Sequence, residues 1–301
     1  MSGGDGFVRP TTVAQAARAL RARAGAVALG GGTDLVPAFR AGAPAPPLIV
    51  ALRGVRELRV RGASADHLIV GAGVTYSELA AWPDAPGLAM AARVVGSAQI
   101  RNAGTVGGAI GTASPRGDLL TYLVAAGADV LAADGARRWR EPLVDRLAAR
   151  GPAASPAAAR APAGAGPVLV TAVVLPRPAG PGVYLKLGAR QAAAPPVLGC
   201  GLVVDSAAGR VSVAVGGVAA VPVRAPDACR FAADQIDWSR PDVPPDTPTR
   251  FGELVAAAVA AAPDPLATPP GGPPAPYLRH AAGVLAGRAL AHCLAEAGGS
   301  T

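Results

Sequence analysis

The sequence of 301 residues contains little lysine, cysteine or aromatic residue. Lys186 is the only lysine among its 28 basic residues, and phenylalanine, tryptophan and tyrosine together make up 4%. A nucleic-acid-binding face typically combines clustered basic residues with stacking aromatics. The arginines are instead scattered along the chain. The net charge of +8 therefore does not indicate a nucleic-acid partner, and we expect none.

Cysteine and histidine patterns exclude several kinds of site. The three cysteines (Cys200, Cys229 and Cys293) lie far apart without a C-x-x-C pair, which predicts neither a disulfide framework nor a protein-bound iron–sulfur or zinc site. Cys293 falls on the apolar stripe of a predicted helix and reads as a core residue. The three histidines form no H-E-x-x-H, and no G-x-S-x-G occurs. We expect no metal site and no catalytic side chain on this chain.

Long hydrophobic runs are also missing. The opening segment MSGGDGFVRP has no basic region followed by an apolar one, so we expect no signal peptide. The longest apolar runs, 119–128 and 254–262, fall short of the about 20 residues that cross a membrane. We therefore expect a cytoplasmic protein without membrane association. Hydrophobic residues still make up 51%, and the length predicts about two domains.

The common nucleotide-binding motifs fail on inspection. The G-x-G sequences at 30–32 and 71–73 lack the third glycine of a Rossmann fingerprint. A P-loop needs glycine before its lysine, but Lys186 lies between two leucines. The chain therefore has no ordinary NAD or ATP loop.

Two glycine-rich stretches are the distinctive features of the chain. The first, GGGTD at residues 30–34, follows a short apolar run and precedes a predicted helix. The second, SAQIRNAGTVGGAIGTASPRGD at 97–118, combines glycines with hydroxyl residues, the only asparagine and a closing aspartate. Glycines let a backbone approach a ligand closely, and N–H groups in such bends bind anions. From the residues alone, each stretch fits a phosphate-binding loop or an ordinary turn.

Hydrophobic periodicity gives a coarse map of the elements. A helix is expected near Tyr76, capped by Thr75 with Glu78 in its first turn. Residues 151–167, rich in Pro, Ala and Gly, are expected to form a loose connector. Strands followed by helices indicate an α+β second domain, so we predict domains at 1–175 and 176–301. The predicted strands are 26–29, 48–52, 58–60, 68–70, 129–132, 168–175, 183–187, 197–204 and 210–218, the last two as a hairpin. The other predicted helices are 12–24, 35–42, 87–95, 119–126, 227–234, 251–262 and 277–297.

Four segments together resemble the FAD-binding (medium) subunit of the molybdenum hydroxylases, the family of carbon monoxide dehydrogenase and bacterial xanthine dehydrogenase. ALGGGTDL at 28–35 is similar to the first flavin loop, and QIRNAGTVGGAIGTASPRGD at 99–118 to the second. VGAGVTYSEL at 70–79 resembles the segment between the loops. YLKLGAR at 184–190 and VGGVAAVPVR at 215–224 resemble the C-terminal domain.

The resemblance implies a fold and a set of FAD-binding residues. The fold is an α+β one, with a vanillyl-alcohol-oxidase (PCMH-type) FAD-binding domain followed by a smaller domain of the CO dehydrogenase flavoprotein C-terminal type. The diphosphate is expected between the two loops, Asp118 beside the hydroxyls on the adenosine side, and Val170 and Lys186 beside the isoalloxazine. The loop residues that the resemblance assigns to the cofactor are Leu29, Gly30, Gly31, Gly32, Thr33, Asp34, Leu35, Thr105, Gly107, Gly108, Ala109 and Ser114.

Lys186 also stands out without the resemblance. A chain that uses arginine everywhere else keeps one lysine here, and a compact ammonium beside the flavin would stabilise its reduced, anionic form. Chance retention of one lysine is the alternative.

The resemblance implies an FAD-dependent oxidoreductase subunit that works within a complex. Electrons would arrive from a molybdenum-cofactor subunit through a [2Fe–2S] subunit, and would leave through FAD to NAD⁺, a quinone or O₂. Ala109, Val168 and the segment Ala194-Pro195-Pro196 depart from the family pattern. These departures favour the alternative of a stand-alone FAD-dependent oxidase or oxygenase acting on a small molecule. A scaffold without flavin is a third possibility.

Overall fold

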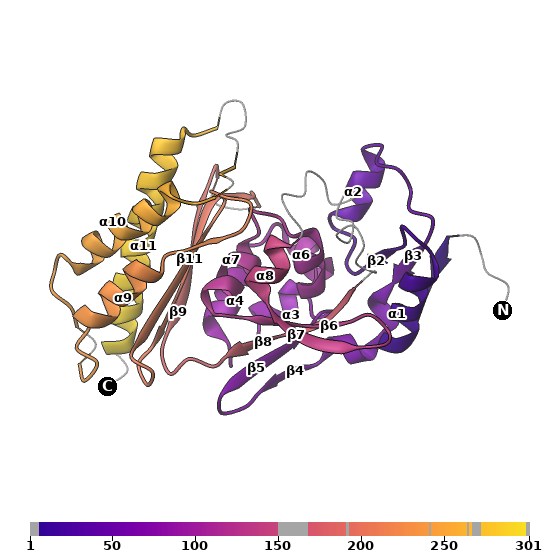
Figure 1. Cartoon of the computed structure of the whole chain (residues 1–301), viewed down its shortest axis with the longest axis horizontal. Helices are drawn as coiled ribbons and strands as arrows, with labels where there is room; N and C mark the ends of the chain where they lie inside the picture. Colours follow the sequence, from indigo (N-terminus) through magenta and orange to yellow (C-terminus); the bar gives the residue numbers. More distant parts are fainter. Residues whose placement is uncertain are drawn as a thin grey trace. The chain divides into compact units, whose positions relative to one another are not determined.

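The computed structural model describes residues 6–149, 168–190, 193–240, 242–263, 265–266 and 272–298. The chain divides into two compact units, which we describe separately (Figure 1). Unit 1 comprises Met1–Leu79, Ser97–Ser114 and Ala128–Leu175, and unit 2 comprises Ala80–Gly96, Pro115–Gly127 and Pro176–Thr301. The two units alternate along the sequence, whereas the predicted domains at 1–175 and 176–301 are contiguous. These domain bounds stay a prediction. The predicted connector at 151–167 lies outside the described residues.

Unit 1 begins with a small parallel sheet in the order β1-β3-β2, formed by β1 (Phe7–Val8), β3 (Ile49–Ala51) and β2 (Val27–Leu29). Helix α1 (Val13–Ala22) starts at Thr12, whose hydroxyl accepts a hydrogen bond from the Gln15 N–H. Its buried residues recur at helical spacing and join the cluster around Val50, which confirms the predicted helix.

A second sheet of unit 1 has the order β4-β5-β8-β6-β7. Its strands are β4 (Arg61–Ala63), β5 (His67–Gly71), β8 (Leu169–Pro176), β6 (Asp129–Ala133) and β7 (Arg138–Pro142). Strands β4 and β7 were not predicted from the sequence. The short helices of this unit are α2 (Leu35–Arg40), α3 (Tyr76–Ala80), α5 (Ala98–Ala103), α6 (Val106–Thr112), α8 (Leu143–Ala148) and the 3₁₀ turns η1 (Leu52–Gly54) and η2 (Arg56–Arg59).

The strand predicted at 58–60 is wrong. Leu58 instead belongs to η2, where its N–H donates to the Val55 carbonyl. Its side chain is fully buried, which explains the apolar residue, and its carbonyl accepts a hydrogen bond from the Gly73 N–H. A short apolar run fits a strand and a buried turn equally well.

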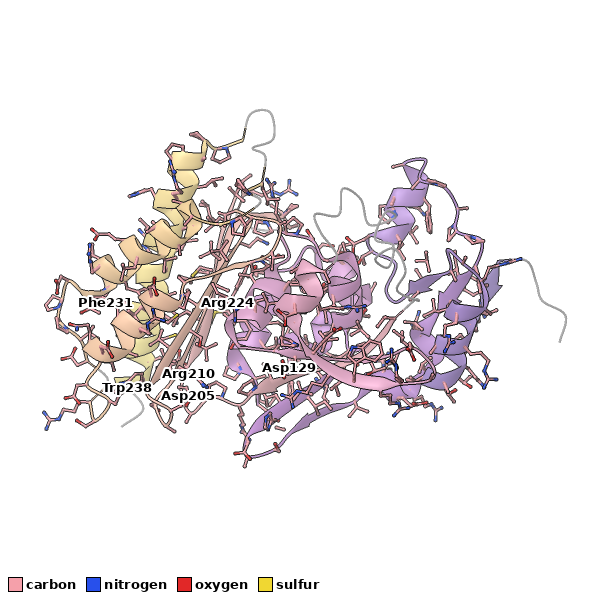
Figure 2. The ribbon with its side chains drawn as sticks, viewed as in Figure 1. Asp129, Asp205, Arg210, Arg224, Phe231 and Trp238 are labelled. Carbon is pink, nitrogen blue, oxygen red and sulfur yellow. The ribbon has the colours of Figure 1, made fainter. Side chains whose placement is uncertain are left out.

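Unit 2 is built on an antiparallel sheet in the order β12-β11-β10-β9. Its strands are β9 (Gly182–Gly188), β10 (Pro196–Asp205), β11 (Arg210–Gly216) and β12 (Val223–Arg224). The predicted hairpin at 197–218 is confirmed as β10 and β11. At its turn the Asp205 carboxylate lies 3.2 Å from the Arg210 guanidinium, and Figure 2 shows the two side chains next to each other.

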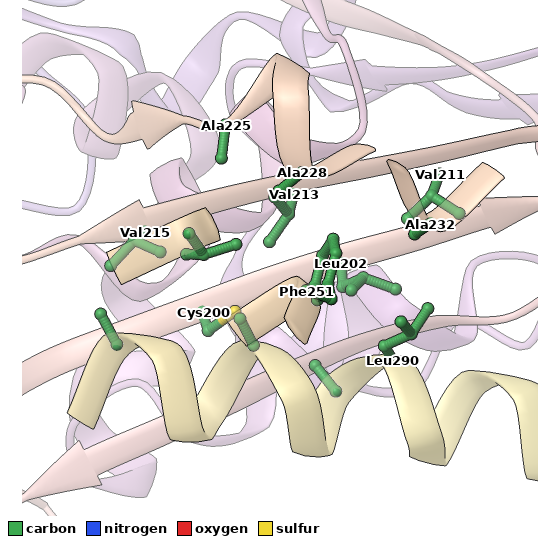
Figure 3. Packing of buried hydrophobic residues seen from close by; sticks show 14 of the residues in the cluster. Cys200, Leu202, Val211, Val213, Val215, Ala225, Ala228, Ala232, Phe251 and Leu290 are labelled. Atoms are coloured by element: carbon green, nitrogen blue, oxygen red, sulfur yellow. The ribbon is translucent and has the colours of Figure 1, made fainter. Parts of the chain in front are cut away.

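Three helices cover one face of this sheet (Figure 1): α9 (Pro226–Gln235), α10 (Thr247–Ala260) and α11 (Ala275–Gly298). Figure 3 shows Cys200, Leu202 and Val213 of the strands packing with Phe251 and Leu290 of the helices. Cys293 belongs to the same buried cluster, and burial raises the pKa of its thiol to about 12, which confirms its interpretation as a core residue.

Helices α4 (Pro86–Arg93) and α7 (Asp118–Ala125) also belong to unit 2. All eight residues of α7 are buried, so this helix is covered on every side rather than exposed on one face. Gly201 of β10 faces it, because a Cβ placed there would lie 2.9 Å from the Tyr122 Cα. Side chains alternate along a strand, so Cys200 and Leu202 of β10 face the three C-terminal helices, and Gly199 and Gly201 lie on the opposite face. We call these two glycines the glycine surface of β10; Gly201 packs against α7.

Candidate functional site

The two predicted flavin loops lie against each other in unit 1. The first follows β2, turns at Gly32 with φ of +70°, and leads into α2. A Cβ on Gly30 would lie 2.8 Å from the Thr105 hydroxyl oxygen, and one on Gly31 would overlap the Ala103 carbonyl. The Thr112 hydroxyl donates to the Asp34 carboxylate at 3.2 Å. Glycine is needed in the first loop because the second loop occupies the space where a side chain would go.

The first loop carries several consecutive backbone donors. The N–H groups of residues 31–34 donate to no acceptor among the residues that the structure describes. The loop does provide acceptors, since the carbonyls of Gly32 and Asp34 accept hydrogen bonds from the Val36 and Ala38 N–H groups of α2. Consecutive N–H groups of this kind form a nest for an anion. The loop therefore fits a phosphate group.

The second loop is not an open glycine turn, because most of it is helical. Helix α5 ends at Gly104, and Thr105 caps α6 by accepting a hydrogen bond from the Gly108 N–H at 3.0 Å. The Gly107 N–H donates to the Ala72 carbonyl at 2.8 Å, and the Ala109 N–H donates to the Thr105 carbonyl at 3.0 Å. The N–H groups of Gly107, Gly108 and Ala109 thus have protein acceptors, whereas the Thr105 N–H, like those of residues 31–34, donates to no acceptor among the described residues.

The other predicted residues of unit 1 lie around these loops. Leu29 ends β2 in register with Ala51, and Leu35 begins α2; both are half-buried. Ser114 is half-buried and follows Ala113, whose left-handed backbone (φ 50°) ends α6. Val170 lies on β8 and packs against the hydrophobic cluster of the unit. Unit 1 thus brings together every predicted site residue except Asp118 and Lys186.

Asp118 and Lys186 belong to unit 2, where they form a buried ion pair. Asp118 is the first residue of α7 and Lys186 lies on β9, with the ammonium nitrogen 3.1 Å from a carboxylate oxygen. The Tyr184 hydroxyl donates to Asp118 at 2.9 Å, and the Lys186 ammonium also donates to the Val94 carbonyl at 3.0 Å. The Asp118 side chain is 6% exposed and that of Lys186 15%.

This cluster shifts the pKa values of its members. Burial raises the pKa of the Asp118 carboxyl, and the neighbouring Lys186 ammonium and Tyr184 hydroxyl only partly oppose that rise. Burial, together with the Asp118 carboxylate, also raises the pKa of Tyr184 well above its usual value. Each carboxylate oxygen of Asp118 has a protein donor, and the expected contact with adenosine hydroxyls stays a prediction.

The ion pair and its two further contacts, with Tyr184 and with the Val94 carbonyl, were not predicted from the sequence. Tyr184 and Lys186 are two residues apart on one strand, and such residues face the same side of a sheet. That spacing was the available signal for their shared partner. The backbone acceptor at Val94 has no side-chain signature, so nothing in the sequence pointed to it.

Known proteins identify the family. Residues 3–178, more than half of the chain, match the family described as the FAD binding domain in molybdopterin dehydrogenase. The chain belongs to this family. The match confirms the predicted resemblance and FAD as the expected cofactor. The medium chain of glyceraldehyde dehydrogenase from Sulfolobus acidocaldarius is 28% identical over 137 residues, which cover 44% of this chain and 49% of that protein. The match to this curated relative thus spans about half of its length.

Solved structures of similar fold cover nearly the whole chain. Reconstituted CO dehydrogenase from Oligotropha carboxidovorans contains a chain that matches with a TM-score of 0.80 at 23% identity, covering 99% of this chain and 100% of that one. Quinoline 2-oxidoreductase from Pseudomonas putida 86 contains another, with a TM-score of 0.79 at 20% identity and the same coverage. At these identities the likeness concerns the fold, and it confirms the predicted fold class.

Within the described residues, no helix has both the length and the hydrophobicity that crossing a bilayer requires. The same residues contain no group of three or more His, Cys, Asp or Glu side chains that could hold a metal ion. The predicted cytoplasmic location stays a prediction.

Proposed function

We propose that this chain is the FAD-binding electron-transfer subunit of a molybdenum hydroxylase. In this proposal, electrons from a molybdenum-cofactor chain arrive through the [2Fe–2S] clusters of a partner chain and leave to NAD⁺, a quinone or O₂. Bound FAD supplies the redox chemistry, and this chain's residues bind and orient it. The family supports the cofactor. The name of the relative from Sulfolobus acidocaldarius, a medium chain, supports the proposal that this chain works within a complex.

The observation that carries the proposal is the row of unused N–H groups at residues 31–34. The FAD diphosphate carries two negative charges, and backbone N–H groups can neutralise them without added side chains. In the second loop, a Cβ on Gly107 would lie 2.7 Å from the Ala72 Cβ, and the N–H groups of Gly107 and Gly108 already donate to Ala72 and Thr105. We therefore assign the diphosphate to the donors of the first loop.

Lys186 is the residue that we propose beside the isoalloxazine. Its ammonium nitrogen lies 3.1 and 3.2 Å from the two carboxylate oxygens of Asp118 and 3.0 Å from the Val94 carbonyl. In this proposal the positive charge of the ammonium, rather than a spare N–H group, stabilises the reduced flavin. The ion pair with Asp118 would then fix the direction in which the ammonium points.

The test of the loop compares two glycines of the paired loops. Gly31→Ala places a methyl group into the Ala103 carbonyl, whereas the same change at Gly111 meets no atom within 4 Å. We expect Gly31→Ala to weaken FAD binding by at least about tenfold and Gly111→Ala by less than about twofold, measured by titrating apoprotein with FAD. Unchanged FAD affinity in Gly31→Ala would overturn the assignment of this loop.

The test of the complex is co-purification. Tagged chain expressed in its native host should carry an iron–sulfur chain and a molybdenum chain, detected by mass spectrometry and metal analysis. Purification alone, with oxidation of a small molecule without partners, would instead support the stand-alone oxidase that the departures at Ala109, Val168 and 194–196 favour. A colourless chain that takes up no FAD would contradict both.

A further inference from the structure

A short segment between β5 and α3 runs alongside the start of the second flavin loop. We call residues 72–76 the bracing segment. The Val106 N–H donates to the Val74 carbonyl at 3.0 Å, and the Tyr76 N–H donates to the Gly104 carbonyl at 3.1 Å. Thr75 and Thr105 form an isolated antiparallel bridge between these two hydrogen bonds. These contacts fix the position of Thr105 relative to the bracing segment.

Thr105 in turn connects both flavin loops. Its hydroxyl oxygen caps α6 through the Gly108 N–H, and it lies close to the backbone of Gly30 in the first loop. Thr105 is itself buried. A displacement of Thr105 would therefore change the start of α6 and the space available to the glycines of the first loop together.

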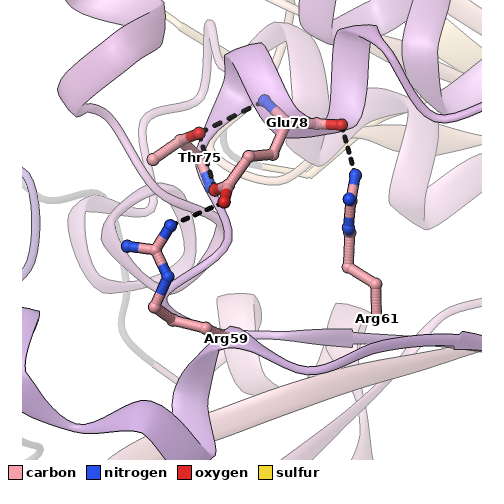
Figure 4. Close-up of polar contacts among 4 residues, drawn as sticks. All are labelled: Arg59, Arg61, Thr75 and Glu78. Atoms are coloured by element: carbon pink, nitrogen blue, oxygen red, sulfur yellow. Dashed lines mark hydrogen bonds and ion pairs between the residues drawn. The ribbon is translucent and has the colours of Figure 1, made fainter.

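Glu78 forms hydrogen bonds with Thr75 of the bracing segment (Figure 4). One carboxylate oxygen accepts from both the N–H and the hydroxyl of Thr75, each at 2.8 Å, and the Glu78 N–H returns a hydrogen bond to that hydroxyl at 3.2 Å. This reciprocal pair is a capping box at the start of α3. The second carboxylate oxygen lies 2.6 Å from the Arg59 guanidinium.

Arg61 completes the arrangement by donating to the Glu78 backbone carbonyl at 2.6 Å (Figure 4). Although burial raises the pKa of Glu78, the hydrogen bonds from Thr75 and the charge of Arg59 bring it below its usual value. Glu78 is therefore ionised at neutral pH and accepts hydrogen bonds with both oxygens. Its carboxylate thus connects η2, the bracing segment and α3.

We propose that Glu78 is a positioning residue for the FAD diphosphate site. It holds Thr75, the bracing segment holds Thr105, and Thr105 sets the spacing of the two flavin loops. Glu78 is not proposed to touch the cofactor. This inference rests on the proposed FAD site and adds to it a residue that fixes the geometry of the loops.

Two conservative variants separate position from charge. Glu78→Gln keeps the length and the oxygen that a capping box needs but loses the charge beside Arg59. Glu78→Asp keeps the charge but is too short to reach the Thr75 N–H. If Glu78 acts by holding Thr75 in place, Glu78→Asp and Glu78→Ala weaken FAD binding by about fivefold to tenfold, and Glu78→Gln by less than about threefold.

The control is Glu253→Ala, which removes a carboxylate from an exposed ion pair with Arg250 at 2.7 Å in unit 2. FAD affinity is measured by fluorescence quenching, and circular dichroism and thermal unfolding of each apoprotein report folding. Wild-type affinity in Glu78→Asp or Glu78→Ala, or equal weakening by Glu78→Gln and Glu78→Ala, would overturn the inference. If Glu78→Ala does not fold, the comparison of Gln with Asp still decides. Failure of wild-type protein to bind FAD would instead contradict the proposed function.

Discussion

The Lys186 ammonium is held where few lysines are found, in a nearly buried position with a carboxylate and a backbone carbonyl as acceptors. Buried ion pairs add little net stability, because both charges lose their hydration on folding. Removing only one partner is costly, since the other charge then stays buried without compensation. The pair of Asp118 and Lys186 is therefore best tested by breaking it on one side.

We predict that Lys186→Met lowers the free energy of unfolding by about 3 kcal/mol at pH 7. Asp118 then loses the charge and hydrogen bond that oppose the effect of burial, so its pKa in the folded state rises further above that of the unfolded chain. The folded state consequently binds more protons, and stability increases as the pH falls through this window. The variant should thus recover part of its loss at pH 5.5, as measured by urea unfolding.

The double variant Asp118→Asn with Lys186→Met serves as the control. It removes both charges, so we expect a smaller loss at pH 7 and no recovery on acidification. Tryptophan fluorescence follows the transition, because Trp82 and Trp238 both belong to unit 2. A Lys186→Met variant that loses stability as the pH falls from 7 to 5.5 would contradict the account of the buried pair.

At the scale of elements, hydrophobic pattern predicted the longer helices and strands well. Helix α1, the hairpin of β10 and β11, and α11 appear close to their expected bounds because each carries several apolar residues at one period. Several short elements were not predicted correctly from this pattern. Strand β7 alternates exposed and half-buried residues, RWREP, and offers no buried apolar stripe to detect. Leu58 was assigned to a strand for the opposite reason, since one buried leucine in a turn looks like part of an apolar run.

The candidate site was predictable where side chains or glycines carry the signal. The glycines were expected to let the backbone approach a ligand, and the structure shows in addition that Gly30 and Gly31 let the first loop approach the second. The hydrogen bonds of the second loop were not predictable. The Gly107 N–H donates to the Ala72 carbonyl, and any residue at position 72 would provide that acceptor. Sequence reasoning therefore located the loops but not which of their donors remain unused.

At the scale of the whole molecule, the two units share the middle of the sequence. Helix α7 is encoded between segments of unit 1, yet it packs within unit 2 against the glycine surface of β10. Helix α4 is likewise encoded before the second flavin loop and belongs to unit 2, where Met90 contacts the backbone of Tyr184 on β9. Neither face of β10 is open to water, because this strand is buried along nearly its whole length.

This arrangement leads to a prediction about the isolated C-terminal region. A fragment of residues 176–301 lacks α4 and α7, so Lys186 loses both Asp118 and Val94, and the glycine surface of β10 is exposed to water. We expect the fragment to bind the dye ANS and to unfold without a cooperative thermal transition, unlike the full chain. Joining residues 115–127 to the fragment by a flexible linker should restore part of the cooperativity, because it returns α7 to β10. A sharp transition and native near-ultraviolet circular dichroism in the fragment alone would favour the contiguous domain at 176–301 and would show that α7 is dispensable for the sheet.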